Sequence, residues 1–234
     1  MRFACVDTST FTESIALVEG ETLWGERSVR RPYGHAPGLH ADLRELLEEL
    51  GWTLESLDAF IIGIGPGSFT GLRVGMAAVK GLAYALNKPV YGVSTAHALL
   101  SALADQREAL ALVDARRGEI YAEGDLIDDP VCLTPECLIE TLNAQSLIPR
   151  ILVGEGAIKH RFLFKEAWPQ VHLPLNTAIH LPRAGLLASG LLISIEAGER
   201  APDELTTLEP IYVRKSDAEI NYPDGFPSEA RLFS

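Results

Sequence analysis

The hydrophobic positions of the first half alternate between short continuous runs and longer stretches with helical spacing. Leucines recur at helical spacing over residues 39–50, and a second helix is predicted over residues 70–87, with a third beginning at Ser94. Apolar runs typical of β-strands occupy residues 3–7, 14–18, 22–29, 59–64 and 90–93. The predicted order of elements is therefore βββαβαβα.

The second half repeats this order. Asp7 ends the first predicted strand of one half and Asp114 ends that of the other, which indicates a duplication. Strands are predicted at residues 110–114, 119–126, 131–133, 150–153 and 171–173, and helices after Thr134, at 157–166 and at 182–196. We expect two α/β subdomains, residues 1–106 and 107–215, followed by a loosely ordered tail at 216–234. This layout is typical of the actin-like/sugar-kinase (ASKHA) fold, in which two such halves flank a nucleotide cleft.

The run from Gly63 to Arg73 joins a predicted strand to a predicted helix and holds four glycines and one proline in its first nine residues. Such a backbone can approach another group closely, and Ser68 or Thr70 can cap the helix. A glycine turn before a helix can also bind an anion through the free backbone N–H groups of the first helical turn. However, no Lys follows at Walker A spacing, and the third glycine of G-x-G-x-x-G is replaced. The sequence therefore favours a turn with a helix cap over a phosphate loop.

The first hairpin has the position, but not the sequence, of a phosphate-binding loop. Active members of the actin-like superfamily carry Asp-x-Gly-Thr/Ser there, whereas this chain places Ser9 at the glycine. A Cβ hinders the close approach of backbone N–H groups to phosphate. Asp7, Ser9 and Thr10 remain the candidate nucleotide contacts, with weak binding expected. In the second half, Arg116 either meets a phosphate or an acidic partner or lies in a solvated turn.

The sequence gives little evidence for a metal site or for a catalytic nucleophile. His35 and His40 are five residues apart, which does not place them on one helix face, and no H-E-x-x-H occurs. Ser94 follows a strand, as a hydrolase nucleophile does, but the final glycine of that motif is missing, so a helix cap is favoured. We expect no metal site and no catalytic serine.

The helix predicted at 70–87 is apolar over too wide a surface for an ordinary surface helix. Small residues form one stripe and larger ones an adjacent stripe, together about twice the usual width of ~100°. The first stripe is Gly71, Gly75, Ala78, Leu82 and Ala85, and the second is Leu72, Met76, Val79, Ala83 and Leu86. Either the sheet and the helix at 39–50 cover both stripes, or a partner's helix packs along Gly71 and Gly75.

The charge of the chain argues against strong direct binding of nucleic acid. The formal net charge is −12 over 234 residues, and no basic stripe occurs to neutralise phosphates. Three cysteines without metal spacing fit a reducing compartment. The chain begins directly with a strand, and residues 184–195 are too few to cross a bilayer of ~30 Å. We therefore expect a cytoplasmic protein.

Several motifs together resemble the TsaB (formerly YeaZ) family, the bacterial partner subunits in biosynthesis of the N6-threonylcarbamoyl group on tRNA adenosine 37. The most specific motif is GPGSFTGLRVG at residues 65–75. The other matching segments are ACVDTS at 4–9, KGLA at 80–83, PVYGVST at 89–95, DARRGEIY at 114–121 and EPIYVR at 209–214. The resemblance is dense in the first half and thinner in the second.

This resemblance implies a non-catalytic scaffold with an actin-like fold and no intact active site. Such a subunit binds and activates TsaD, the catalytic paralogue that carries the metal-binding histidines and the nucleotide, while TsaE, an ATPase, joins the pair. It implies no tightly bound cofactor, with any ATP or ADP bound weakly at the TsaD interface. Alone, the chain is expected to form a homodimer, and it contacts tRNA only indirectly.

The resemblance also places the TsaD contact on the helices predicted at 39–50 and 70–87. The expected interface residues are Leu39, Leu43, Gly71, Leu72, Arg73, Gly75, Met76, Ala78, Val79 and Leu82. The alternative function is an independent kinase-like ATPase or a peptidase of the same fold.

Overall fold

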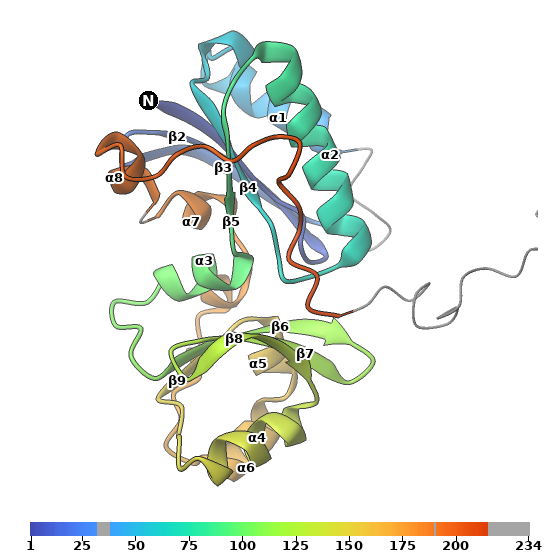
Figure 1. The fold of residues 1–234 in the computed structure, drawn as a ribbon, viewed down its shortest axis with the longest axis vertical. Helices are drawn as coiled ribbons and strands as arrows, with labels where there is room; N and C mark the ends of the chain where they lie inside the picture. Colours follow the sequence, from blue (N-terminus) through green and yellow to red (C-terminus); the bar gives the residue numbers. More distant parts are fainter. Residues whose placement is uncertain (32–37, 190, 215–234) are drawn as a thin grey trace, which may run out of the picture.

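The computed structural model describes residues 1–31, 38–189 and 191–214, so His35 and the predicted tail at 216–234 lie outside the described residues. Two lobes are stacked one above the other in Figure 1, each built on one mixed β-sheet. The predicted fold class, a duplicated α/β protein of two subdomains, is confirmed.

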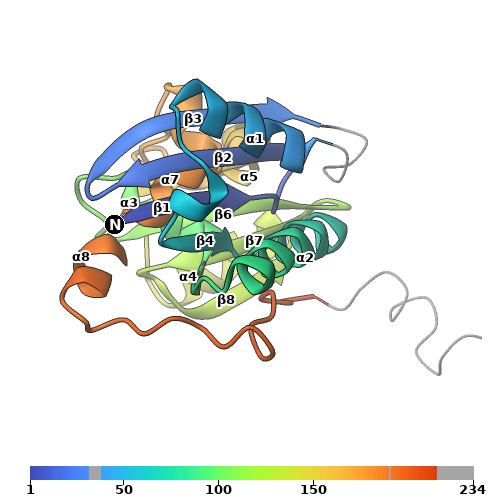
Figure 2. The same ribbon diagram turned by 90° about the horizontal axis from the view of Figure 1, so that it is seen from above.

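The first lobe contains a five-stranded sheet in the order β3-β2-β1-β4-β5. In Figure 2, β3, β2, β1 and β4 succeed one another across this lobe. The central strand β1 pairs antiparallel with β2 and parallel with β4. The strands are β1 (Arg2–Asp7), β2 (Thr12–Glu19), β3 (Thr22–Arg30), β4 (Ala59–Gly63) and β5 (Val90–Val93). The helices between them are α1 (Leu39–Glu49), the 3-10 turn η1 (Leu54–Ser56), α2 (Phe69–Leu86) and α3 (Thr95–Ser101).

The second lobe repeats this topology with the order β8-β7-β6-β9. Its central strand β6 is antiparallel to β7 and parallel to β9, as β1 is to β2 and β4. The strands are β6 (Ala109–Arg116), β7 (Glu119–Gly124), β8 (Ile127–Leu133) and β9 (Ile151–Val153). The helical elements are α4 (Pro135–Ala144), α5 (Glu155–Lys159), α6 (Arg161–Ala167) and the 3-10 turn η2 (Thr177–His180).

Three predicted elements of the second half differ in the structure. The strand predicted at 171–173 is a single bridge between His172 and Ile151. The helix predicted at 157–166 divides into α5 and α6, because His160 leaves helical geometry with φ −107° and ψ 21°. The helix predicted at 182–196 divides into α7 (Ala184–Ala188) and α8 (Leu191–Glu196).

Helices α7 and α8 lie on the first sheet, not on the second as the predicted subdomain 107–215 implies. The side chains of Phe3 and Cys5 in β1 point to one face of that sheet and belong to one hydrophobic cluster with residues of both helices. Ala4 and Val6 point to the opposite face and pack against α1 and α2. A strand that is apolar on both sides needs cover on both sides, and the chain returns to the first lobe to supply it.

The second sheet is also covered on both faces. Alternate side chains of β6 face α4, α5 and α6 on one side and α3 on the other. Helix α3 therefore lies between the two sheets, as Figure 1 shows. The loops at the ends of β1 and β6 meet beside this helix, which brings the two matched hairpins together.

Candidate functional site

The first hairpin ends β1 with a buried carboxylate, since Asp7 is 1% exposed. Its Oδ1 accepts hydrogen bonds from the backbone N–H of Ser9 at 2.9 Å and from the Ser9 hydroxyl at 2.6 Å. Its Oδ2 accepts a hydrogen bond from the Thr95 hydroxyl at 2.8 Å, at the start of α3. Both carboxylate oxygens therefore serve the internal structure of the first lobe.

The glycine run before α2 packs on this hairpin. The Ser68 N–H donates to the Ser9 carbonyl at 2.6 Å, and a Cβ on Gly67 would overlap that same carbonyl. A Cβ on Gly63 would overlap the Asp7 carboxylate. Ser68 also caps α2, because its hydroxyl accepts a hydrogen bond from the Gly71 N–H at 3.3 Å. The group that these glycines approach closely is thus the chain's own first hairpin.

The matching turn of the second lobe carries two arginines in an unusual backbone conformation. Arg116 and Arg117 have φ values of 64° and 51°, the left-handed region, which costs a residue other than glycine about 1–3 kcal/mol. Asp114 Oδ1 accepts hydrogen bonds from the Arg116 N–H at 3.0 Å and from Lys159 Nζ at 2.8 Å. The Arg116 guanidinium lies 4.3 Å from the centre of the Phe11 ring in the first hairpin. The tips of the two hairpins therefore touch.

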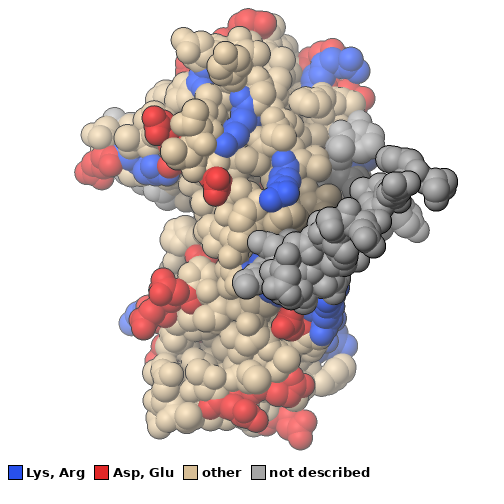
Figure 3. All heavy atoms as spheres, turned by 45° about the vertical axis from the view of Figure 1, so that its right-hand side comes forward, with Lys and Arg blue, Asp and Glu red and all other residues tan. Residues whose placement is uncertain are grey.

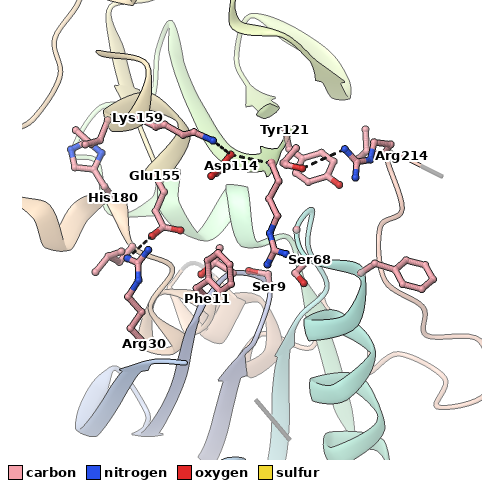
Figure 4. Close-up of a pocket in the computed structure, with 18 of the residues that line it drawn as sticks. Ser9, Phe11, Arg30, Ser68, Asp114, Tyr121, Glu155, Lys159, His180 and Arg214 are labelled. Carbon is pink, nitrogen blue, oxygen red and sulfur yellow. Dashed lines mark hydrogen bonds and ion pairs between the residues drawn. The ribbon is translucent and has the colours of Figure 1, made fainter. Parts of the chain in front are cut away.

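A cavity of about 1360 Å³ lies between the lobes and is lined by both hairpins. Figure 4 shows Ser9 and Phe11 on one side of it and Asp114 and Lys159 on the other. Arg30 of β3 reaches Glu155 of α5 at 3.4 Å across the cavity. Burial raises the pKa of the Glu155 carboxyl, and the charge of Arg30 opposes that shift.

Two of the three candidate nucleotide contacts line this cavity. Ser9 and Thr10 do so, although they are 1% and 7% exposed, whereas Asp7 is not among the described lining residues. His180 also lines it but is used structurally, since its Nδ1 accepts from the Gly154 N–H at 3.1 Å and its Nε2 lies 2.7 Å from the Pro174 carbonyl. Among the described residues, no group of three or more His, Cys, Asp or Glu could hold a metal ion.

Most of the expected interface residues lie in the interior of the first lobe. A buried side chain cannot touch a partner unless the fold opens, so these residues can only support an interface from inside. The buried members are Leu39, Leu43, Gly71, Leu72, Gly75, Met76 and Val79. Arg73 is exposed, and Ala78 and Leu82 are partly covered by the core.

The two glycines of the small stripe of α2 pack against the residue that follows β1. The Thr8 hydroxyl donates to the Gly71 carbonyl at 2.8 Å, and a Cβ on Gly75 would overlap that hydroxyl. The two glycines therefore allow α2 to lie close to its own hairpin. Two interpretations of the wide apolar surface of α2 were open. At Gly71 and Gly75 the surface is covered by residues of the same chain.

A different side of α2 is exposed and still low in charge. Tyr84 is 82% exposed, and α2 contains no Asp or Glu although the whole chain has a net charge of −12. We name this surface the exposed α2 face and define it as Arg73, Val74, Ala77, Gly81, Tyr84 and Ala85, of which Val74 is partly buried. Figure 3 shows a broad area of the upper lobe that is mostly uncharged, with isolated basic and acidic side chains. Sequence periodicity placed the apolar stripe correctly on α2 but did not show which part the fold leaves uncovered.

Ser94 joins the two lobes. Its Oγ accepts a hydrogen bond from the His97 N–H at 3.2 Å, which caps α3, and donates to the Glu123 carboxylate of β7 at 2.8 Å. Burial raises the pKa of Glu123, and the hydrogen bond from Ser94 opposes that shift. The hydroxyl is thus a helix cap, as the sequence favours, and it also makes a contact between the lobes that the sequence did not predict.

Ser94→Ala is expected to destabilise the protein by about 2 kcal/mol, the combined loss of a helix cap and of a hydrogen bond to a charged group. The free energy of unfolding in urea measures this change. Ser94→Thr keeps the hydroxyl and should retain most of the stability. A loss of hydrolytic turnover in Ser94→Ala with unchanged stability would contradict the structural role and favour a peptidase.

None of the helices in the described part of the chain has the length and hydrophobicity that a membrane span needs.

Two sheets of matching strand order, with their first hairpins facing one cavity, define an actin-like protein of two lobes. The activator of 2-hydroxyisocaproyl-CoA dehydratase from Clostridium difficile has this fold, with a TM-score of 0.50 and 10% identity over 87% of this chain and 100% of that chain. YeaZ from Pseudomonas aeruginosa superimposes with a TM-score of 0.71 and 30% identity, over 91% of this chain and 100% of that chain. The chain belongs to the TsaB (YeaZ) family.

Sequence comparisons agree with this assignment. An uncharacterised protein of Mycobacterium tuberculosis is 38% identical over 220 residues, 91% of this chain and 92% of that protein. The tRNA threonylcarbamoyladenosine biosynthesis protein TsaB of Bacillus subtilis is 25% identical over 233 residues, 95% of this chain and 98% of that protein. The family model of TsaD, tRNA N6-adenosine threonylcarbamoyltransferase, matches residues 34–130.

Proposed function

We propose that this chain is a non-catalytic scaffold that binds and activates a TsaD-type partner in the threonylcarbamoylation of tRNA adenosine 37. The observation that carries the proposal is the exposed α2 face. Its alanines and Gly81 permit close approach of another helix, and Tyr84 offers an exposed aromatic side chain of the kind enriched at the centres of interfaces.

The match of residues 34–130 to the TsaD family supports a partner of related fold. This segment contains both α1 and α2, so the two proteins would share these helices in similar form. Two related lobes that present similar helices can pack as a pseudo-symmetric pair, in the way that equivalent patches meet in a two-fold dimer. The same face would form a homodimer when the partner is absent.

The first hairpin supports a role without chemistry of its own. Asp7 is held by Ser9 and Thr95, and the Ser9 carbonyl is used by Ser68, so this hairpin is organised around internal contacts. Activation would then follow from differential binding: the chain stabilises the partner conformation that its α2 face fits, which raises the population of the competent state. TsaE would join this pair in the cytoplasm, tRNA would contact the partner, and any ATP or ADP would bind weakly at the interface.

The experiment that tests this proposal is reconstitution with TsaD from the same organism. We expect the two proteins to co-purify as a heterodimer, and we expect threonylcarbamoylation of tRNA, with threonylcarbamoyl-adenylate and TsaE supplied, to depend on this chain. Equal activity of TsaD without this chain would contradict the activating role. The absence of a heterodimer at micromolar concentrations would contradict the scaffold role.

A further inference from the structure

The last part of the described chain runs along one side of α2. Asp203 forms a bridge with β5, the strand that follows the C-terminal end of α2. Leu208 belongs to the hydrophobic cluster that contains the buried residues of α2. The Ile211 N–H donates to the Ile64 carbonyl at 2.8 Å, just before the turn that opens α2. Residues 203–211 therefore run antiparallel to α2, and Figure 1 shows them beside this helix.

The chain is held at the first turn of α2 where it leaves the described structure. The centres of the Tyr212 and Phe69 rings are 5.0 Å apart, and Arg73 Nε donates to the Tyr212 hydroxyl at 3.1 Å. Two residues later, Arg214 forms an ion pair with a carboxylate of β7 at 2.6 Å. The C-terminal segment, which we define as residues 215–234, therefore starts beside the N-terminal end of the exposed α2 face.

The length of the C-terminal segment allows it to reach every part of this face. Its 20 residues could extend over roughly 66 Å at ~3.3 Å per residue. The 18 residues of α2 span only about 27 Å at ~1.5 Å per residue. A segment tethered so close to a surface has an effective concentration in the millimolar range, so even weak contacts can hold it there.

The composition of the C-terminal segment complements the exposed α2 face. The segment contains four Asp or Glu and two Lys or Arg, whereas α2 carries Arg73 and Lys80 and no acidic residue. Opposite charges on two surfaces favour their association. The segment also has large apolar and aromatic side chains that an exposed apolar helix face can bury, namely Ile220, Tyr222, Phe226, Leu232 and Phe233.

A hollow at the far end of α2 could hold one of these side chains. This cavity of about 320 Å³ lies beside Tyr84, and its apolar walls include Ala83, Pro89 and Pro202. Its volume is several times the ~30 Å³ share of a water molecule, so one aromatic ring fits. An aromatic anchor in a small pocket is the usual centre of a protein interface.

We propose that in the monomeric chain the C-terminal segment folds back and covers the exposed α2 face. Burial of apolar side chains on both surfaces drives this contact, and the opposite charges add to it. Any other occupant of the face must first displace the segment, so its apparent affinity falls by the fraction of the chain in which the face is covered. The inference concerns the face of the proposed partner contact, but it requires no partner.

The test is the rate of alkylation of a cysteine at position 77 in the full chain carrying Ala77→Cys. Ala77 is exposed in the middle of the face. The reagent is N-ethylmaleimide, the product is located by peptide mass spectrometry, and the chain is kept dilute enough for light scattering to show a monomer. Adding Tyr222→Ser and Phe226→Ser should make the reaction about tenfold faster, as expected if the face is about 90% covered before these changes. Cys137, exposed on α4, is the internal reference and should react equally fast in both proteins.

The matched control is the pair Ser216→Ala and Ser228→Ala, which changes the same segment but keeps its aromatic side chains. It should leave the slow reaction at position 77 unchanged, and near-native thermal unfolding would show that each variant remains folded. Equal rates at position 77 with and without Tyr222→Ser and Phe226→Ser would overturn the proposal. Protection that is absent from the monomer and appears only at high protein concentration would identify a second copy as the cover instead. Because no partner protein is present, these results are independent of heterodimer formation.

Discussion

Ala77→Glu is expected to abolish the heterodimer with a TsaD-type partner while the isolated chain stays folded. Ala77 is exposed on α2, between Arg73 and Gly81 on the exposed α2 face. A carboxylate buried there without a partner would lose its hydration, which costs several kcal/mol, so affinity should fall at least about a hundredfold. Glu is a good helix former, so the helix itself loses only a few tenths of a kcal/mol.

Size-exclusion chromatography with light scattering measures this effect, and the modification of tRNA in the reconstituted system should fall in parallel. Ala144→Glu is the matched control, because Ala144 is an exposed alanine at the end of α4 in the second lobe. It makes the same change of charge and volume away from α2 and should leave the heterodimer intact. A heterodimer of normal affinity in Ala77→Glu would remove α2 from the proposed interface.

Gly75→Leu is expected to destabilise the isolated chain by more than about 4 kcal/mol, a large part of the ~5–15 kcal/mol that holds a domain folded. A Cβ at this position already overlaps the Thr8 hydroxyl, which is bonded to the Gly71 carbonyl. A leucine would force α2 away from β1 and break that hydrogen bond. Gly75→Ala should have a milder effect of about 2 kcal/mol from overpacking. Chemical denaturation monitored by circular dichroism measures both.

Gly81→Ala provides the control on the same helix. Nothing lies within 4 Å of a Cβ at Gly81, so this substitution should stabilise the chain by up to about 1 kcal/mol through helix preference alone. Thr8→Ala should partly rescue Gly75→Ala, because the smaller side chain makes room and the two effects are then coupled. Equal effects of alanine at Gly75 and Gly81, or no coupling with Thr8, would contradict the close packing of α2 on β1.

The candidate site shows where residue-level prediction works and where it fails. Ser68 and Ser94 were predictable as caps, because a cap depends on local sequence and on the helix that follows it. The glycines of α2 were correctly recognised as positions of close approach. Their neighbour was not predictable, since Thr8 lies more than sixty residues away along the chain.

The cavity between the lobes could not be predicted either, because its lining residues are also far apart in the sequence. Arg73, Arg116 and Arg161 are separated along the chain and share no motif, so no sequence pattern connects them. The duplication brings the two hairpins together, and only then do these arginines line one cavity. Neither the exposed α2 face nor this cavity could be defined before the burial of each side chain was known.

The sequence by itself determined the order of strands and helices in the first half, the duplication and the family, because these depend on periodicity, capping and contiguous motifs. It also determined that α2 is more apolar than an ordinary surface helix. Only the tertiary structure decided that α7 and α8 return to the first sheet and that Thr8, directly after β1, packs against Gly71 and Gly75 of α2. Periodicity shows that a face must be covered, but the covering element is chosen by packing between residues far apart in sequence.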